Sequence, residues 1–395
     1  MKRILLEPVA KLSLRKHMSF QIDLGPRERK SPFFANTVAD GVTHFTIYNH
    51  MFMPVSYGNP EAEYRRLIEG VSMWDVAAER QVEIIGTDAE RLVRYLTPRD
   101  LKGCEAGQGR YLPLCDHEGR LINDPILLRL SNDHFWLSIA DSDILLWVRA
   151  IAEEHGFLVS VYEPDVSPLA IQGPLGEAVA ADLLGNWVRD LKYFSFKEVV
   201  FDGIPLVVMR SGWSKQGGFE LFLRDGSKGA KLWERVKEVG ASCQIGPGAP
   251  NHIERIESGL LSFGADTLPD SDPFEVGLEN LISLNRNDDF VGKKALIRKA
   301  MDGPARKLVG VKLDGAPISS NEHPWPAMVG DQFVGMVRAA CYSPRRRQNI
   351  GLALIDTPYA GLGTTVEITG ETHGYVGEIV ELPLVKPGTS ITKVI

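Results

Sequence analysis

The hydrophobic and polar positions of the first three quarters of the chain predict short strands and helices in mixed order. Residues 43–48 alternate as a strand does, whereas residues 59–70 begin at Asn-Pro and end at a glycine, which predicts a helix. The same criteria predict strands at 81–85, 110–114, 125–130, 134–139, 157–162, 169–171, 198–201, 204–210 and 219–222, and helices at 88–96, 144–155, 176–184, 228–239 and 253–261. These elements follow neither a strict alternation nor a repeat, so the predicted class is α+β.

The last quarter of the chain has a different pattern. After a break in composition at residues 301–307, only short strands are predicted, separated by Gly, Pro and Asp; they are 308–313, 332–337, 350–355, 364–368 and 375–381. Such spacing indicates a small all-β domain, either a barrel or a jelly roll. We therefore divide the chain into an α+β region, residues 1–305, and a β domain, residues 306–395. Residues 1 to about 35 are polar and predict an N-terminal arm.

Composition excludes several classes of protein. A chain of 395 residues predicts two to three domains, and 44% hydrophobic with 24% charged residues is ordinary for a folded protein. The net charge of −7 argues against nucleic-acid binding. No apolar run approaches the roughly 18 residues of a membrane span, and the basic first thirty residues lack the apolar core of a secretory signal. Four widely spaced cysteines indicate reduced thiols, so we expect a cytoplasmic protein.

Motifs taken singly carry little chemistry. The nine histidines show no metal-ligand spacing, and no G-x-G-x-x-G follows a strand, so we expect neither a metal nor a nicotinamide. Residues 212–216, GWSKQ, lack the final glycine of a nucleophile elbow.

Seven segments taken together carry a stronger signal. They are Met53-Pro54, Trp74-Asp75-Val76, Asn123-Asp124, Trp136-Leu137, Ile171 to Pro174, Gly212 to Glu220 and Arg255-Ile256-Glu257. In this order the chain, from about residue 45 to its end, resembles the glycine-cleavage T-protein (aminomethyltransferase) family. The resemblance implies a three-domain cloverleaf around a central folate cavity, with two interleaved α+β domains, and tetrahydrofolate as the co-substrate of one-carbon transfer.

Longer sequence segments resemble those of the dimethylsulfoniopropionate demethylases within that family. They include Trp74 to Glu83 (WDVAAERQVE), Arg210 to Gly218 (RSGWSKQGG), Asn251 to Ser258 (NHIERIES) and Ala340 to Pro344 (ACYSP). This resemblance implies transfer of a methyl group from dimethylsulfoniopropionate to N5 of tetrahydrofolate, giving methylthiopropionate and 5-methyltetrahydrofolate. Two alternatives stay open: another methylated sulfonium, amine or aryl ether as the donor, and a folate-binding protein without turnover. The expected partners are small molecules, and a homodimer is left open.

The resemblance also implies cofactor-binding residues. A carboxylate matches the N–H donors on the edge of a pterin, and the last residue of the family pattern G-Y-T-G-x-x-G-x-E has that role. Residues 212–220 read GWSKQGGFE, which gives the role to Glu220 and places Trp213 where the family has a stacking tyrosine. Arg255 and Ser138 join them by resemblance. The alternatives are a surface position for Glu220 and an ion pair of Arg255 with Glu257.

Asn123 and Asp124 occupy the position that the resemblance makes catalytic. T-proteins carry two acids there and the first is catalytic, whereas this chain has the amide of Asn123 first. A sulfonium donor releases a neutral thioether that needs no proton, so alignment of the reactants suffices and an acid is not required. The alternative for Asn123 is a turn cap.

Binding of a sulfonium donor calls for aromatic and cationic side chains. A cation favours an aromatic face, and we expect Tyr48 and Trp74 among the donor-binding residues. Lys215 is expected to bind the donor's carboxylate, with Arg210 and Arg80 as unranked alternatives. Tyr48 has core packing as its alternative.

Overall fold

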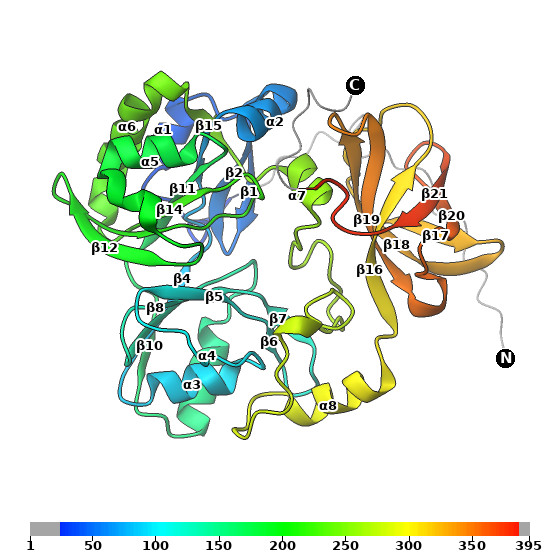
Figure 1. Ribbon diagram of the computed structural model, residues 1–395, viewed down its shortest axis with the longest axis horizontal. Helices are drawn as coiled ribbons and strands as arrows, with labels where there is room; N and C mark the ends of the chain where they lie inside the picture. Colours follow the sequence, from blue (N-terminus) through cyan, green and yellow to red (C-terminus); the bar gives the residue numbers. More distant parts are fainter. Residues whose placement is uncertain (1–23, 387–395) are drawn as a thin grey trace.

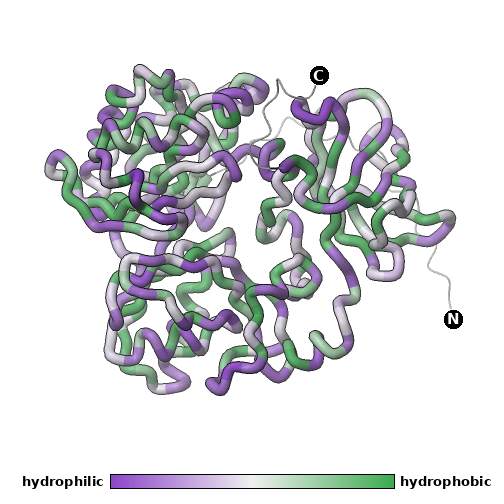
Figure 2. The backbone as a smooth tube through the Cα atoms, in the orientation of Figure 1, coloured by the Kyte–Doolittle hydropathy of each residue, from purple (hydrophilic) through white to green (hydrophobic). Residues whose placement is uncertain are grey.

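The computed structural model describes residues 24–386, which form three lobes, each built on a sheet (Figure 1). Hydrophobic stretches run through all three lobes (Figure 2). The predicted α+β class is confirmed. Most of the predicted N-terminal arm, residues 1–23, lies outside the described residues. In the remainder, Arg29 pairs with Met51 in an isolated bridge before α1 (Phe34–Ala39) begins.

The first lobe contains a six-stranded sheet in the order β12-β13-β14-β11-β3-β15. Its strands are β3 (Ser72–Asp75), β11 (Ser167–Gln172), β12 (Phe196–Phe201), β13 (Ile204–Met209), β14 (Gly218–Leu223) and β15 (Gly246–Gly248). Helices α5 (Gly176–Leu184) and α6 (Gly229–Val239) bury Val179 and Leu232 against Leu169 and Leu221 of this sheet. Beside them lie α2 (Pro60–Glu69) and the hairpin of β1 (His44–Tyr48) and β2 (Met51–Ser56).

The second lobe contains a five-stranded sheet in the order β10-β4-β9-β8-β5. Its elements are β4 (Gln81–Ile85), β5 (Gln108–Tyr111), β8 (Ile126–Arg129), β9 (His134–Ser138), β10 (Ser160–Tyr162), α3 (Ala89–Leu96) and α4 (Leu145–Glu154). A small pair, β6 (Leu114–Cys115) and β7 (Leu121–Asn123), lies outside the sheet. The chain passes from the first lobe to the second between β3 and β4, and it returns to the first lobe at β11. The first two lobes are therefore interleaved in sequence, and the linkers between them lie where the two lobes meet.

The third lobe is a closed barrel in the order β16-β19-β18-β17-β20-β21, which decides between the predicted barrel and jelly roll. Its strands are β16 (Arg306–Leu313), β17 (Trp325–Val329), β18 (Gln332–Ser343), β19 (Gln348–Asp356), β20 (Thr365–Thr369) and β21 (Gly374–Val380). Closure leaves no strand edge unpaired. Strand β17 was not predicted, because Pro324 and Pro326 hide its pattern.

Two further helices connect the lobes. Helix α7 (His252–Ser258) begins at Asn251, whose side chain accepts the Glu254 N–H, and ends at Gly259 in the left-handed region with φ 64°. Helix α8 (Lys293–Asp302) precedes the barrel directly.

Candidate active site

Three elements bring one carboxylate each to a common cluster. Glu79 lies in the β3–β4 linker, Asp124 follows β7, and Glu220 lies on β14. Burial raises the pKa of Asp124 to about 7 and raises that of Glu220. The pKa of Glu79 is also raised, first by burial and then by the charges of Glu220 and Asp124. We call these three residues the carboxylate cluster. Buried carboxylates of this kind favour a cation or N–H donors as partners.

Two tyrosines border the carboxylate cluster. The phenol of Tyr111 donates a hydrogen bond of 2.7 Å to Asp124. Tyr48, at the end of β1, has its pKa raised by burial and then by the charges of Glu79 and Asp124. Both side chains are half-buried, and their raised pKa values keep the phenols neutral. The role predicted for Tyr48 in binding the donor stays a prediction.

The loop before β14 is shaped around one glutamine. Gln172 donates to the carbonyl of Ser211 at 3.0 Å and accepts from Ser214 at 2.8 Å. A Cβ at Gly212, where φ is 143°, would come within 1.9 Å of this glutamine amide, so the close approach requires glycine. The loop therefore has a fixed path into β14. At the start of the loop, the Ser211 hydroxyl donates to the Glu220 carboxylate.

The same loop carries Trp213, and helix α7 supports its tip. Trp213 is half-buried. Glu254 of α7 accepts hydrogen bonds from the backbone N–H of Lys215 at 3.1 Å and from the Gln216 side chain at 2.8 Å. The Lys215 side chain itself is exposed. The sequence analysis did not predict this role of Glu254, although Glu254 lies in the NHIERIES segment.

Arg255 is buried and pairs with Asp266 at 2.8 Å. The predicted alternative, an ion pair with Glu257, is not formed. Glu257 binds Arg345 instead, with 2.7 Å between its carboxylate and the guanidinium Nε. The charge of Asp266 adds to the raised pKa of Asp124, so the Arg255–Asp266 pair borders the carboxylate cluster.

Asn123 is fully buried and every polar atom of its amide is bonded to the β9–α4 loop. Its Nδ2 donates to the carbonyls of Ala140 and Ser142 at 3.1 and 3.0 Å, and its Oδ1 accepts the Ala140 N–H at 3.1 Å. These partners lie 17 and 19 residues away, so Asn123 does not cap a local turn. Both N–H donors of the Asn123 amide are used in holding the loop, and a neutral amide is not a group for proton transfer.

Two other predicted residues have structural partners. Ser138 accepts a hydrogen bond from the Gln81 amide at 2.9 Å and donates one to the backbone carbonyl of Glu79 at 3.5 Å, so it helps to fix the backbone at Glu79. Trp74 is buried, and its indole donates to Ser72 at 2.9 Å. In the register of the sheet Trp74 and Glu220 both pair with residue 170, and so share a face.

The two alternative cations are held by acidic neighbours. Arg80 contacts Asp143 at 3.3 Å and also binds Glu163. Arg210 binds Glu177 at 2.7 Å. Neither guanidinium reaches a residue of the carboxylate cluster through these contacts.

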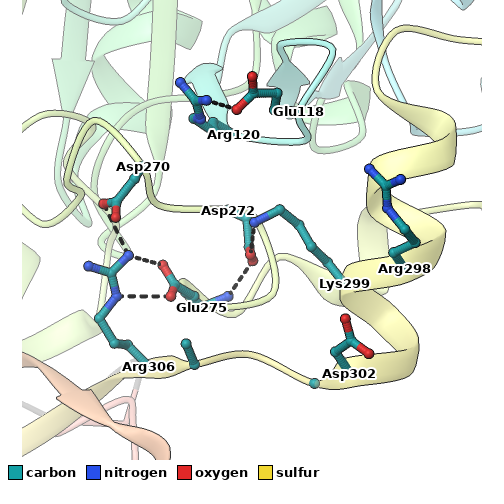
Figure 3. A pocket seen from close by; sticks show the side chains of 11 residues that line it. Glu118, Arg120, Asp270, Asp272, Glu275, Arg298, Lys299, Asp302 and Arg306 are labelled. Atoms are coloured by element: carbon teal, nitrogen blue, oxygen red, sulfur yellow. Dashed lines mark hydrogen bonds and ion pairs between the residues drawn. The ribbon is translucent and has the colours of Figure 1, made fainter.

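A separate pocket of about 660 Å³ lies beside α8 and the start of β16 (Figure 3). Its charged side chains bind one another: Lys299 contacts Asp272 at 2.9 Å, and Arg306 contacts Glu275 at 2.9 Å and Asp270 at 3.1 Å. None of the predicted site residues lines it. These ion pairs connect α8 and the first strand of the barrel to residues 270–275. The pocket is therefore a structural junction between these elements.

Residues 24–386 contain neither a candidate metal site nor a candidate membrane span. No group of three or more His, Cys, Asp or Glu side chains is arranged to hold a metal ion. No helix in this part of the chain is long and apolar enough to cross a membrane.

Comparison with known proteins identifies the family of this chain. Residues 34–286 match the GCVT N-terminal domain, and residues 306–386 match the glycine cleavage T-protein C-terminal barrel domain. The dimethylsulfoniopropionate demethylase DmdA of Ruegeria pomeroyi is 42% identical over 87% of this chain and 93% of its own length. An aminomethyltransferase of Bacillus mycoides is 29% identical over 85% of this chain and 92% of its own. The aminomethyltransferase T structure from Bartonella henselae superposes with a TM-score of 0.82 at 23% identity, covering 91% of this chain and 99% of that one. The chain belongs to the glycine cleavage T-protein family.

Proposed function

We propose that this protein is a tetrahydrofolate-dependent demethylase that transfers a methyl group from dimethylsulfoniopropionate to N5 of tetrahydrofolate. The products are methylthiopropionate and 5-methyltetrahydrofolate. The observation that carries the proposal is the carboxylate cluster, in which Glu79, Asp124 and Glu220 come together beside Tyr48. The 42% identity to a demethylase of this type over most of both chains supports the choice of donor.

The residues around Glu220 fit a reduced pterin. Glu220 is 7% exposed and accepts from Ser211, which leaves a carboxylate edge available to the N–H donors of a pterin. Trp213, on the rigid loop that ends at Glu220, is half-buried and suited to stacking. Tetrahydrofolate supplies N5, the nucleophile that accepts the methyl group. Glu220 and Trp213 orient it, and the Arg255–Asp266 pair lies at the border of this site.

Tyr48, Glu79 and Asp124 are assigned to the donor. The donor's sulfonium is cationic, and the half-buried ring of Tyr48 together with two carboxylates provides an aromatic face and negative charge. The C–S bond would break with its electron pair left on sulfur as the C–N5 bond forms, so the positive charge would pass to N5, and release of the N5 proton would then give neutral 5-methyltetrahydrofolate. The carboxylates of Asp124 and Glu79 are assigned to stabilise positive charge on the donor side, and Glu220 to bind the pterin. The chain's contribution is therefore orientation and charge, without an acid at residue 123.

The exposed Lys215 is assigned to the carboxylate of the donor, because Arg80 and Arg210 are already held by acidic partners. Trp74 is not part of this assignment, since its indole is buried and bonded to Ser72. The free thiols of Cys104, Cys115, Cys243 and Cys341 suit a reducing compartment, and we assign the enzyme to the cytoplasm.

The test is a donor panel with purified protein and tetrahydrofolate. Dimethylsulfoniopropionate, a trimethylated amine, an aryl methyl ether and an aminomethyl donor are compared, with 5-methyltetrahydrofolate and ammonia measured. We expect 5-methyltetrahydrofolate from the sulfonium alone, and its loss in Glu220→Gln but not in a Glu367→Gln control on the barrel. Turnover of another donor replaces the substrate assignment, and folate binding without any turnover contradicts the enzyme.

A further inference from the structure

Two buried asparagines converge on one peptide group. The Nδ2 of Asn49 donates to the carbonyl of Ala140 at 3.0 Å and to that of Ala78 at 3.1 Å. The Nδ2 of Asn123 donates to the same Ala140 carbonyl at 3.1 Å and to Ser142 at 3.0 Å. The Ala140 N–H returns to Asn123 Oδ1. Asn49 is 4% exposed and Asn123 is fully buried. We call Asn49, Asn123 and the peptide of Ala140 the amide clamp.

The amide clamp joins segments that are distant in sequence. Asn49 belongs to the β1–β2 turn, Ala78 to the β3–β4 linker, Asn123 to the end of β7, and Ala140 to the β9–α4 loop. The turn is fixed a second time, because the backbone N–H of Asn49 donates to Asp141 at 2.8 Å. Buried amides with satisfied donors hold their partners in one arrangement, since breaking a single bond leaves a buried group unpaired.

Three of the four held segments carry a residue of the site at an adjacent position. Asn49 follows Tyr48, and Ala78 precedes Glu79. Asn123 precedes Asp124. The clamp therefore fixes the backbone at the three points from which the donor-binding side chains extend.

We propose that the amide clamp is the device that positions Tyr48, Glu79 and Asp124 for methyl transfer, and that Asn123 is a positioning residue rather than a catalytic one. This inference rests on the proposed function. An amide is required at residue 123 because a carboxylate cannot donate to the carbonyls of Ala140 and Ser142.

The clamp does not hold the folate side of the site. Glu220 lies on β14 and is bonded by Ser211, and neither residue contacts Asn49 or Asn123 through a hydrogen bond among those found in residues 24–386. Loss of the clamp therefore affects the donor side more than folate binding. That difference separates positioning from general destabilisation.

The first test measures hydrogen exchange and is independent of activity. Asn123→Ser replaces one amide with a shorter hydroxyl. Asn49→Gly removes the other amide and keeps the left-handed backbone, where Asn49 has φ 47°. His50→Gly is the matched control, since the exposed His50 has φ 60° in the same turn. We expect each clamp variant to raise exchange about tenfold in both residues 44–56 and residues 138–145, and the control to raise it in neither. A rise confined to the segment that carries the substitution overturns the proposal.

The second test measures turnover and folate affinity in the same variants. We expect kcat to fall about 100-fold, because misplacement by about 1 Å has that effect, while the Kd for tetrahydrofolate changes less than about threefold. The double variant should lose no more than either single variant, since both break one unit. Equal losses of folate affinity and kcat, or losses that multiply, overturn the proposal. If the wild type makes no 5-methyltetrahydrofolate, the proposed function fails, and the exchange pattern still decides whether the clamp exists.

Discussion

Replacing Asp124 with Asn removes a carboxyl whose pKa is raised to about 7 by the fold. Burial is the first cause, and the hydrogen bond from Tyr111 opposes it in part. Because the folded pKa lies above the unfolded value of about 3.9, the folded protein binds this proton more tightly than the unfolded chain. The stability that the bound proton contributes is fully present below about pH 4 and is lost as the pH rises through 7.

The magnitude follows from the size of the shift. About three pKa units at about 1.36 kcal/mol each correspond to about 4 kcal/mol of stability lost once the pH exceeds 7. Of this, about 2–3 kcal/mol is lost between pH 5 and pH 8. The amide carries no charge and keeps an oxygen that accepts the Tyr111 hydroxyl. The free energy of unfolding of Asp124→Asn should therefore rise relative to wild type by about 2–3 kcal/mol between these two pH values.

Urea unfolding at pH 5 and pH 8 measures this difference. Asp314→Asn is the control, because Asp314 is exposed at the end of β16, far along the chain from the cluster. In turnover assays we expect the kcat/KM of the wild type to rise through pH 7, since the ionised carboxylate attracts the cationic donor, and the Asp124→Asn variant should lose much of this rise. A stability difference between variant and wild type that stays constant from pH 5 to pH 8 would refute the reasoning.

Three further outcomes follow from the same contacts. Glu220→Gln should weaken tetrahydrofolate binding by about 1–3 kcal/mol in calorimetry, with unchanged circular dichroism, because pterin donors lose a charged acceptor; unchanged affinity in a folded variant contradicts the pterin assignment. Glu257→Gln removes the charge of the buried carboxylate that binds Arg345 and should lower the free energy of unfolding by about 3–5 kcal/mol in urea, and a change below 1 kcal/mol argues against a structural role for the pair. Dialysis against a chelator should leave turnover unchanged, and a loss restored by added metal shows that the absence of a metal was predicted wrongly.

Sequence patterns predicted the features that are encoded locally. The segment from Gly212 to Glu220 contains the glycines that its close approach to Gln172 requires. The role of Glu220 came from the resemblance of this segment to a family pattern, and it stays a prediction. Helix α5 was predicted with its observed ends, because a glycine follows its last turn.

Residues whose role depends on how the lobes meet were harder to predict. Glu79 lies in an irregular linker with no periodicity, and only the crossing from β3 to β4 brings it to Asp124 and Glu220. Trp74 shows the opposite difficulty. From the sequence alone, an aromatic residue in a segment that resembles the family can be a binding residue or a core residue. In the structure Trp74 is buried under α2, as the strand order of the sheet requires. No pattern in the chain predicts that Asn49 and Asn123, which are 74 positions apart, share one carbonyl.

The placement of the carboxylate cluster joins stability to function. Burial raises the pKa of Asp124, Glu79 and Glu220, so each ionised carboxylate destabilises the folded protein. The same loss of water strengthens their attraction to a cation, because electrostatic interactions grow as the local dielectric constant falls. Repulsion among the three would push their segments apart. The amide clamp opposes that movement at Glu79 and Asp124, and Ser211 opposes it at Glu220. The neutral amides of Asn49 and Asn123 provide this restraint without adding charge. A cation in their place would neutralise the cluster, whereas hydrogen bonds from amides leave its negative charge available to the donor.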